Sequence, residues 1–152
     1  MHGVRALLAA CAGFLVGVLW MDLMFDVQVF GAPVEVPEAA LASIASYYGR
    51  VTTDAWPMGP VIACVMVVAV LAAAWQALRA PGLRTAAVLL LVVLPVALAL
   101  GRVVPDAVRL GTRADPVAAQ AALARSIGRG HVICIASMLA VVVLQLVPRR
   151  EA

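Results

Sequence analysis

The chain has 152 residues, of which 65% are hydrophobic and 12% are charged, and its mean hydropathy is +1.07. Soluble domains are usually about 45–50% apolar and about 25% charged, so this composition excludes an ordinary water-soluble domain and predicts an integral membrane protein. The formal charge of +3 comes from arginine without any lysine, and so small an excess does not indicate nucleic-acid binding.

Four apolar segments are each long enough to cross a bilayer, which takes about 20 helical residues. We expect membrane spans at residues 4–24, 57–78, 85–104 and 131–147. Pro57 suits the first turn of the second span, and Pro95 predicts a kink within the third. The sequence therefore predicts one all-α integral membrane domain over residues 1–152, built as a four-transmembrane-helix bundle.

The connections between these spans are unequal in length. Residues 79–84 form a tight turn, whereas the other two links are long and, with four spans, lie on the same side of the membrane. Each long link has the signals of a short helix. We expect one from Pro37 to a stop at Gly49, and one that Asp115 caps and Gly128 ends.

Arginine distribution predicts the orientation of the bundle. Arg5, the two arginines of the short turn, Arg149 and Arg150 favour termini and turn on the cytoplasmic side of a bacterial inner (plasma) membrane. The opposite side carries six arginines against these five, but they have acidic neighbours. Trp20 and Trp56 then mark the outer boundary of the bilayer, and Trp75 marks the inner one.

The outer side gathers most of the charged residues. The first half of the chain contributes Asp22, Asp26, Glu35, Glu38 and Asp54, and the second half contributes Arg102, Asp106, Arg109, Arg113, Arg125, Arg129 and His131. Asp22 and Asp26 are four residues apart and share a helix face. The residues at 102, 106, 109 and 113 form one stripe on a helix that continues to Gly111, and we expect this stripe to pair within itself and to face the two acids.

These charged residues have two interpretations, which the sequence leaves open. They are either ion pairs that fasten the rim of the bundle or the polar pocket of a small-molecule site, since ionisable groups within a membrane are costly and often functional. In the second case His131, Asp22 and Asp26 are the candidate catalytic residues. Arg102, Arg109, Asp106 and Tyr48 are the candidate ligand-binding residues, and Tyr47 would also line the mouth.

His131 is expected to be a neutral imidazole, because it follows Arg129 and opens the fourth span at a helix N-terminus. A neutral imidazole can act as a general base or accept a hydrogen bond. Asp22, Asp26 and His131 have the side-chain types of metal ligands, but their spacing matches no established signature, so we predict no metal site. The sequence identifies no cofactor.

Small residues indicate how the helices pack. Ala9, Gly13 and Gly17 lie at intervals of four and allow close approach of another helix, either inside the bundle or in a homodimer. The three cysteines at 11, 64 and 134 lie in apolar runs without metal or redox spacing, so we expect all of them to be buried.

Two stretches of the sequence resemble a known family. "ARSIGRGHVICIAS", with the pair His131 and Val132, and "ASYYGRVTTDAWPMGPVI" before the second span are similar to the anthrone-oxygenase-like family of small four-span membrane proteins. Family members often carry Trp and Asn before this histidine, where the present chain has Gly130. The resemblance implies a membrane-bound oxygenase that needs no cofactor.

Three functions follow as hypotheses. The first is a four-span membrane protein whose outer polar pocket binds or transforms a small hydrophobic molecule. The second is a non-catalytic accessory subunit of a larger membrane complex, and the third is a small transporter. The expected partners are the lipid bilayer, a hydrophobic small molecule, and either a second copy of the chain or a membrane complex, but no nucleic acid.

Overall fold

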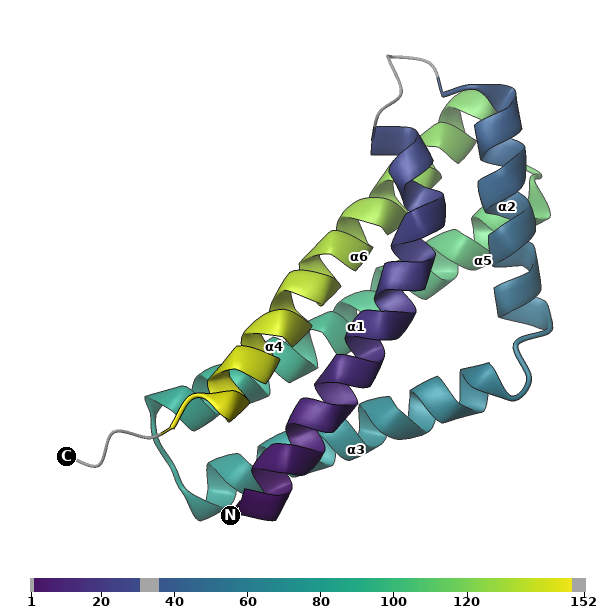
Figure 1. The fold of residues 1–152 in the computed structure, drawn as a ribbon. Coiled ribbons are helices and arrows are strands. Elements are labelled where there is room, and N and C mark those ends of the chain that lie inside the picture. Colours follow the sequence, from purple (N-terminus) through teal and green to yellow (C-terminus); the bar gives the residue numbers. More distant parts are fainter. Residues whose placement is uncertain (1, 31–35, 149–152) are drawn as a thin grey trace.

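The computed structural model describes residues 2–30 and 36–148, and the regular structure within these ranges is helical (Figure 1). In chain order the elements are α1 (His2–Phe30), α2 (Glu38–Thr53), α3 (Met58–Arg79), α4 (Leu83–Leu98), the π-helical turn η1 (Ala99–Val103), α5 (Val104–Thr112) and α6 (Val117–Leu146). α4, η1 and α5 follow one another without a break and form one long helix.

Four of these helices are long and apolar enough to cross a membrane, namely His2–Phe30, Met58–Arg79, Leu83–Thr112 and Val117–Leu146. α2 is shorter, lies outside this set, and joins α1 to α3. The prediction of an all-α bundle with four candidate membrane spans is therefore confirmed, and the protein has the architecture of a multi-pass membrane protein.

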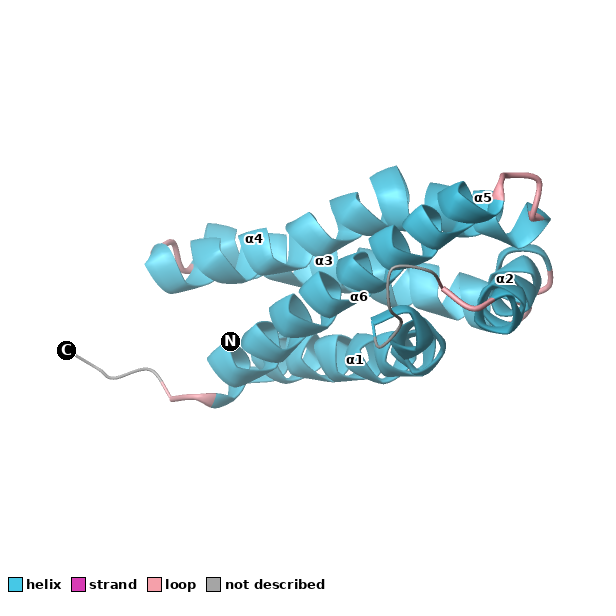
Figure 2. Ribbon diagram, turned by 90° about the horizontal axis from the view of Figure 1, so that it is seen from above, coloured by secondary structure: helices cyan, strands magenta, loops and turns pink. Residues whose placement is uncertain are grey.

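The bundle consists of two stacked sections that share α1 and α6. These two helices pack along each other, while their partners change from α3 and α4 in one section to α2 and α5 in the other (Figure 1). Viewed from above, α2 lies between the end of α1 and α5 (Figure 2). We call the first the membrane section and the second the cap.

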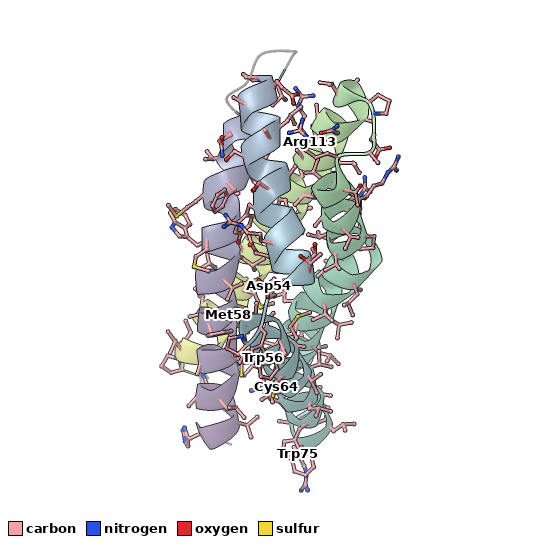
Figure 3. All side chains as sticks on the ribbon, turned by 90° about the vertical axis from the view of Figure 1, so that its right-hand side faces the viewer. Asp54, Trp56, Met58, Cys64, Trp75 and Arg113 are labelled. Atoms are coloured by element: carbon pink, nitrogen blue, oxygen red, sulfur yellow. The ribbon has the colours of Figure 1, made fainter. Side chains whose placement is uncertain are left out.

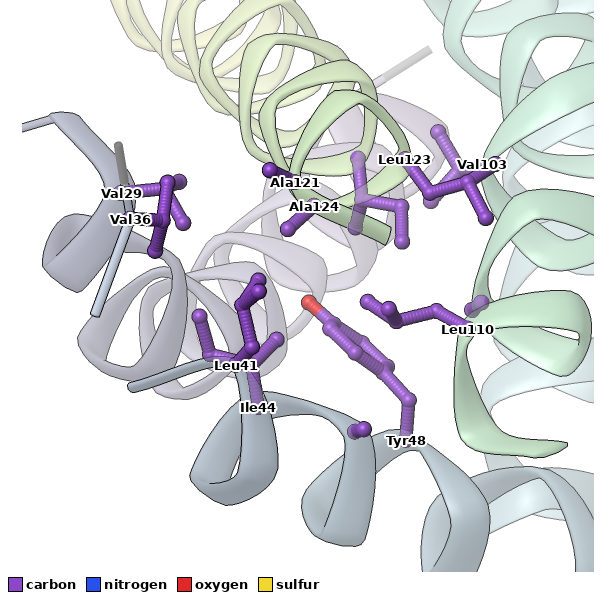
Figure 4. Packing of buried hydrophobic residues seen from close by; sticks show 13 residues of the cluster. Val29, Val36, Leu41, Ile44, Tyr48, Val103, Leu110, Ala121, Leu123 and Ala124 are labelled. Carbon is purple, nitrogen blue, oxygen red and sulfur yellow. The ribbon is translucent and has the colours of Figure 1, made fainter. Parts of the chain in front are cut away.

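Each section has its own apolar core. The membrane section is built around buried residues of α1, α3, α4 and α6, among them Leu8, Leu15, Ala73, Val88, Val92 and Met138. The cap is built around Leu41, Ile44, Tyr48, Leu110, Ala124 and Ile127, with the phenol ring of Tyr48 inserted among aliphatic side chains (Figure 4). The boundary between the two cores therefore crosses α1 and α6 near residues 22–26 and 131.

Two glycines that we expected to end helices lie inside them. α2 begins at Glu38 but passes Gly49, and α6 runs unbroken from Val117 through Gly128, so the second link and the fourth span form one helix. Gly49 is where the backbone of α2 meets Gly111 of α5: a Cβ on Gly111 would lie 2.9 Å from the Gly49 backbone. These glycines permit close helix contact and do not act as helix stops.

Two further expectations about small residues were wrong. A Cβ on Gly13 or Gly17 would meet no atom within 4 Å among the described residues, so this face of α1 points out of the bundle and does not pack inside it. Cys11 and Cys134 are buried as predicted, but Cys64 is exposed on α3. The homodimer alternative for the α1 glycines stays a prediction.

The end of the bundle opposite the cap is closed by polar contacts. The amides of Gln76 and Gln145 are buried and bond reciprocally, with N–O distances of 3.1 and 2.9 Å. Arg5 donates to the carbonyl oxygens of Gln145 and Val147, which satisfies acceptors left open at the end of α6. Trp75 lies at this end, with the guanidinium carbon of Arg79 4.2 Å from the centre of its ring, whereas Trp56 lies near mid-height with Asp54 above it (Figure 3).

Replacing Gly111 by alanine tests the close contact between α2 and α5. We expect Gly111→Ala to destabilise the protein by about 1–3 kcal/mol, because the methyl group would overlap the backbone of Gly49 and no flexible side chain is there to yield. The measurement is the thermal unfolding midpoint in detergent. Gly17→Ala is the matched control, since that methyl has open space; equal midpoints for both variants would contradict the contact.

Candidate functional site

Five polar and aromatic side chains meet where the membrane section joins the cap. Asp22 and Asp26 come from one face of α1, Tyr47 and Tyr48 come from α2, and His131 comes from α6. We call these five residues the Asp–His–Tyr cluster. Because α1 rises about 1.5 Å per residue, Asp22 lies ~30 Å along the helix from His2, which is about the thickness of the hydrocarbon core.

The Asp26 carboxylate is the centre of the cluster and is fully buried. Its Oδ2 lies 2.6 Å from His131 Nδ1, and its Oδ1 accepts a hydrogen bond of 2.7 Å from the Tyr48 hydroxyl. An ionised carboxylate only accepts hydrogen bonds, so Nδ1 carries the hydrogen, an assignment that follows from chemistry. In the neutral ring, Nε2 is then an acceptor that faces away from Asp26.

Asp22 occupies the other side of the imidazole. Its Oδ1 accepts a hydrogen bond of 2.6 Å from the Tyr47 hydroxyl, and the Tyr47 ring stacks on Phe25 with centroids 3.9 Å apart. Its Oδ2 is 3.8 Å from His131 Nε2, which exceeds hydrogen-bonding distance. The Asp22 side chain is 18% exposed. Asp22 and Nε2 thus face each other across a short gap that is open to a cavity.

Two cavities meet at this gap, because Asp22 and His131 line both of them. One cavity, of about 200 Å³, lies inside the membrane section; we call it the membrane cavity. Apart from Asp22 and His131 its lining is apolar and includes Leu19, Met66, Val92, Leu100, Cys134 and Met138. The other, of about 540 Å³, lies under α2; we call it the vestibule, and its polar lining includes Tyr47, Arg50, Thr52 and Asp54.

The two tyrosines remain hydrogen-bond donors over the ordinary pH range. Burial raises the pKa of Tyr47 well above its usual value, and the hydrogen bond to Asp22 raises it further. Burial also raises the pKa of Tyr48 strongly, with the charge of Asp26 as the second cause. Both phenols therefore stay protonated and hold the two carboxylates in place.

Glycines on α6 create the space for this arrangement. A Cβ on Gly128 would lie 3.2 Å from the Cβ of Asp26 and 2.8 Å from Cζ of Phe30. A Cβ on Gly130 would lie 2.5 Å from Cγ2 of Val103. The run "GRGH" therefore lets α6 approach α1 on one side and η1 on the other, which brings the imidazole of the following residue to Asp26.

The third span is distorted beside the membrane cavity. Pro95 has no amide hydrogen, so the carbonyl four residues earlier cannot receive its usual helical bond. The π-helical turn η1 begins four residues later, at Ala99. The Cys134 thiol donates a hydrogen bond to the carbonyl oxygen of Pro95, with a sulfur–oxygen distance of 3.9 Å. Single π-helical turns are frequent at functional sites, and this one borders the cavity.

Four of the candidate site residues are brought together as expected, namely Asp22, Asp26, His131 and Tyr48. The expectation that His131 lies at a helix N-terminus was wrong, because α6 begins at Val117 and His131 lies in its middle, and the neutral imidazole stays a prediction. The contact of Tyr47 with Asp22 was not predicted, although the adjacent tyrosines had suggested a lining role.

The expectation that the charged stripe of the third span faces these acids was wrong. Arg102 bonds to Ser126, whose hydroxyl donates to Asp106, and these three residues form a separate contact at the surface. Arg109 makes two hydrogen bonds, of 2.7 and 2.6 Å, to Asp115. Asp115 therefore binds a guanidinium and does not cap α6.

Two further ion-pair contacts lie outside the cluster. Arg109 lowers the pKa of the Asp115 carboxyl by hydrogen bonding and by its charge. Arg113 forms an ion pair with Glu38, which ties the end of α5 to the start of α2. Glu35, Arg149 and Arg150 lie outside the described residues.

The geometry of the cluster differs from that of a metal site. The two ring nitrogens of His131 face two different carboxylates, so Asp22, Asp26 and His131 do not converge on one point. In residues 2–30 and 36–148, no group of three or more His, Cys, Asp or Glu side chains has an arrangement that could hold a metal ion.

Comparison of the chain with protein-family models, curated proteins and solved structures finds no match. The four-span architecture is therefore established by the structure, and no family match supports the anthrone-oxygenase resemblance. What the cluster does must be argued from its own geometry.

Replacing Tyr48 by phenylalanine tests the role of its hydroxyl at neutral pH. Tyr48→Phe removes one donor from the buried Asp26 carboxylate, and we expect a loss of about 1–3 kcal/mol in the free energy of unfolding. Denaturation at pH 7 in detergent measures this loss. Tyr47→Phe is the matched control and should cost less, because Asp22 can be solvated.

The same variant gives a pH-dependence test. A tyrosine whose folded pKa lies above its unfolded value of about 10 contributes stability below that pH and loses it as the pH rises. The wild-type unfolding midpoint should therefore fall more steeply above about pH 10 than that of Tyr48→Phe. Parallel curves for the two proteins would show that Tyr48 is not held in its protonated form by the fold.

Proposed function

We propose that this protein binds a small, mainly apolar molecule in the membrane cavity and exchanges a proton with its single polar group. His131 Nε2 is the proton acceptor in this proposal, and Asp22 is the second polar contact. Asp26 and Tyr48 are positioning residues, since they contact the imidazole and each other but lie on the side away from the cavity.

The observation that carries the proposal is the position of the imidazole between a buried carboxylate and a cavity. Asp26 fixes Nδ1 at 2.6 Å, so the ring orientation is determined, and Nε2 is directed to the gap beside Asp22. An oriented imidazole with one nitrogen bound to a carboxylate is the usual arrangement of a general base. A ligand hydroxyl that enters beside this gap of 3.8 Å can donate its single hydrogen to Nε2 and lies next to the Asp22 carboxylate.

The size and polarity of the cavity define the ligand. Apolar cavities of about 150 Å³ are known to bind a benzene ring, so a cavity of this size suits one substituted ring. The ring would occupy the apolar part lined by Val92 and Met138, while its hydroxyl reaches Asp22 and His131. A phenol meets both requirements, because its hydroxyl is weakly acidic and the rest of the molecule is apolar.

A chromogenic phenol tests the proposal directly. 4-Nitrophenol absorbs visible light as the phenolate but not as the phenol, so transfer of its proton to His131 is visible at a pH where the free probe is protonated. We expect wild-type protein in detergent to give the phenolate spectrum at mildly acid pH. His131→Gln should lose this signal and bind about tenfold to a hundredfold more weakly, the effect of losing a hydrogen bond to a charged partner.

Two further variants act as controls. Asp106→Asn removes a carboxylate that lies with Ser126 and Arg102, outside both cavities, and should bind the probe like the wild type. Cys134→Leu reduces the volume of the membrane cavity without removing a cluster residue and should weaken binding. An unchanged spectrum in His131→Gln, or no binding by the wild type, would overturn the proposed function.

We also propose that the protein lies in a bacterial inner membrane with both termini in the cytoplasm. Arg5 and Arg84 at the end opposite the cap support this orientation, because arginine is enriched in cytoplasmic loops. A reporter fused after Arg84 is then expected to remain cytoplasmic, and one fused after Asp54 is expected to be exported. The reverse pattern would place the cap and its cluster on the cytoplasmic side.

A second candidate function is an accessory subunit of a membrane complex. The observation that favours it is the outward-facing position of Gly13 and Gly17 on α1, since exposed small residues allow another membrane helix to pack closely. The anthrone-oxygenase resemblance remains a third, finer proposal. What supports it is that His131, the residue of the resembling stretch, lines the membrane cavity.

A further inference from the structure

We infer that the ligand of the membrane cavity is an amphiphile dissolved in the bilayer, whose ring enters the cavity while an alkyl tail stays between α3 and α4 in the lipid. This inference rests on the proposed function, because it assigns the ligand class and the entry route of the same site. It follows from the relation between the membrane cavity and a second hollow on the outer surface of the bundle.

That hollow is an apolar groove between α3 and the end of the third span. It is lined by Ala63, Met66, Val67, Val70, Leu71, Val96 and Leu100, with no polar side chain among them. Leu71 and Leu100 are each 64% exposed, so the groove opens to the surroundings of the protein. We call it the lipid groove.

The wall between the lipid groove and the membrane cavity is only one side chain thick. Met66, Val96 and Leu100 line both spaces, so the same three side chains separate them. Methionine is unbranched and adapts its shape easily, so Met66 can move aside at low cost. A Cβ on Gly101, the neighbour of Leu100, would meet no atom within 4 Å, which leaves open space next to the wall.

The backbone beside this wall is also irregular. Val96 follows Pro95 directly, and Leu100 belongs to the π-helical turn η1. Both features interrupt regular helical bonding in the segment that carries two of the three wall residues. The opposite wall, formed by α1 and α6, is regular helix throughout and has the most extensive helix contact of the bundle.

The depth of the wall determines what lies outside it. α3 has 22 residues and is therefore ~33 Å long, close to the hydrocarbon thickness. Met66 lies eight residues, or ~12 Å, from the start of α3, so the lipid groove opens among acyl chains, below the headgroups. A ligand that passes Met66 and Leu100 therefore arrives from the bilayer, and its apolar tail can remain there.

The vestibule is the alternative entrance and is more polar than the lipid groove. Arg50, Thr52 and Asp54 line it among apolar side chains, and Asp54 is exposed above the start of α3 (Figure 3). An alkyl tail left in this space would cover these charged and hydroxyl groups, which is unfavourable because their solvation would be lost. The vestibule instead suits exchange of the proton with water, since it reaches Asp22 and His131 from the polar side.

A pair of probes that differ only in a tail tests the inference. The first probe is 4-nitrophenol, and the second is 4-nitrophenol carrying a long alkyl chain, both titrated into wild-type protein in phospholipid nanodiscs. We expect both to give the phenolate spectrum with the wild type. Ala63→Trp fills part of the lipid groove at a residue that does not line the membrane cavity, so it should weaken the tailed probe roughly tenfold, the scale of overpacking, while 4-nitrophenol changes less than about twofold.

Val67→Trp is a second variant, at a groove residue that also does not line the membrane cavity, and keeps the test valid if Ala63→Trp does not fold. Leu90→Trp is the matched control, because Leu90 is 64% exposed on the third span but lines neither the cavity nor the groove. Binding of 4-nitrophenol without binding of the tailed probe would overturn the inference and leave the proposed function intact. An equal effect of Ala63→Trp and Leu90→Trp would also overturn it, and failure of both probes would overturn both.

Discussion

The buried carboxylate of Asp26 is the constraint on which the rest of the structure depends. An ionised carboxylate without partners in a low-dielectric interior costs many kcal/mol, so its position requires donors on every accessible side. His131 and Tyr48 supply them from α6 and α2, and loss of one donor to such a buried carboxylate typically costs about 1–3 kcal/mol. One carboxylate on α1 thus fixes the relative positions of three helices.

This constraint also explains why the bundle has two sections. A plain four-span bundle would leave Asp26 at the membrane boundary with only α6 beside it, whereas α2 covers α1 there and brings two phenols to its acidic face. The close contact of Gly49 with Gly111 lets α2 pack on α5, and Gly128 lets α6 pack closely on α1. Stability and the geometry of the proposed site therefore depend on the same contacts.

Much of the cluster could be predicted from the sequence, because the even number of membrane spans and the spacing of residues along a helix are strong constraints. Four spans bring both long links to one side, and a spacing of four puts Asp22 and Asp26 on one face. The charged stripe was misjudged because its helix has two faces. Val103, Ala107 and Leu110 are buried in the cap, so the charges at 102, 106 and 109 point to the surface and pair there. An apolar stripe at the same spacing could have indicated this orientation.

Glycine was the other source of error, and its reason is instructive for membrane proteins. A glycine near the end of an apolar run often ends a helix, but a glycine inside a helix also lets a neighbouring helix approach closely. The glycines at 49, 128 and 130 remain helical and serve as contact points for neighbouring helices. The position of His131 depends on two of them, because the absence of side chains at 128 and 130 lets α6 come close to α1 and η1. The imidazole of His131 therefore reaches the buried carboxylate of Asp26. The same imidazole also lines the membrane cavity, which single side chains separate from the lipid groove.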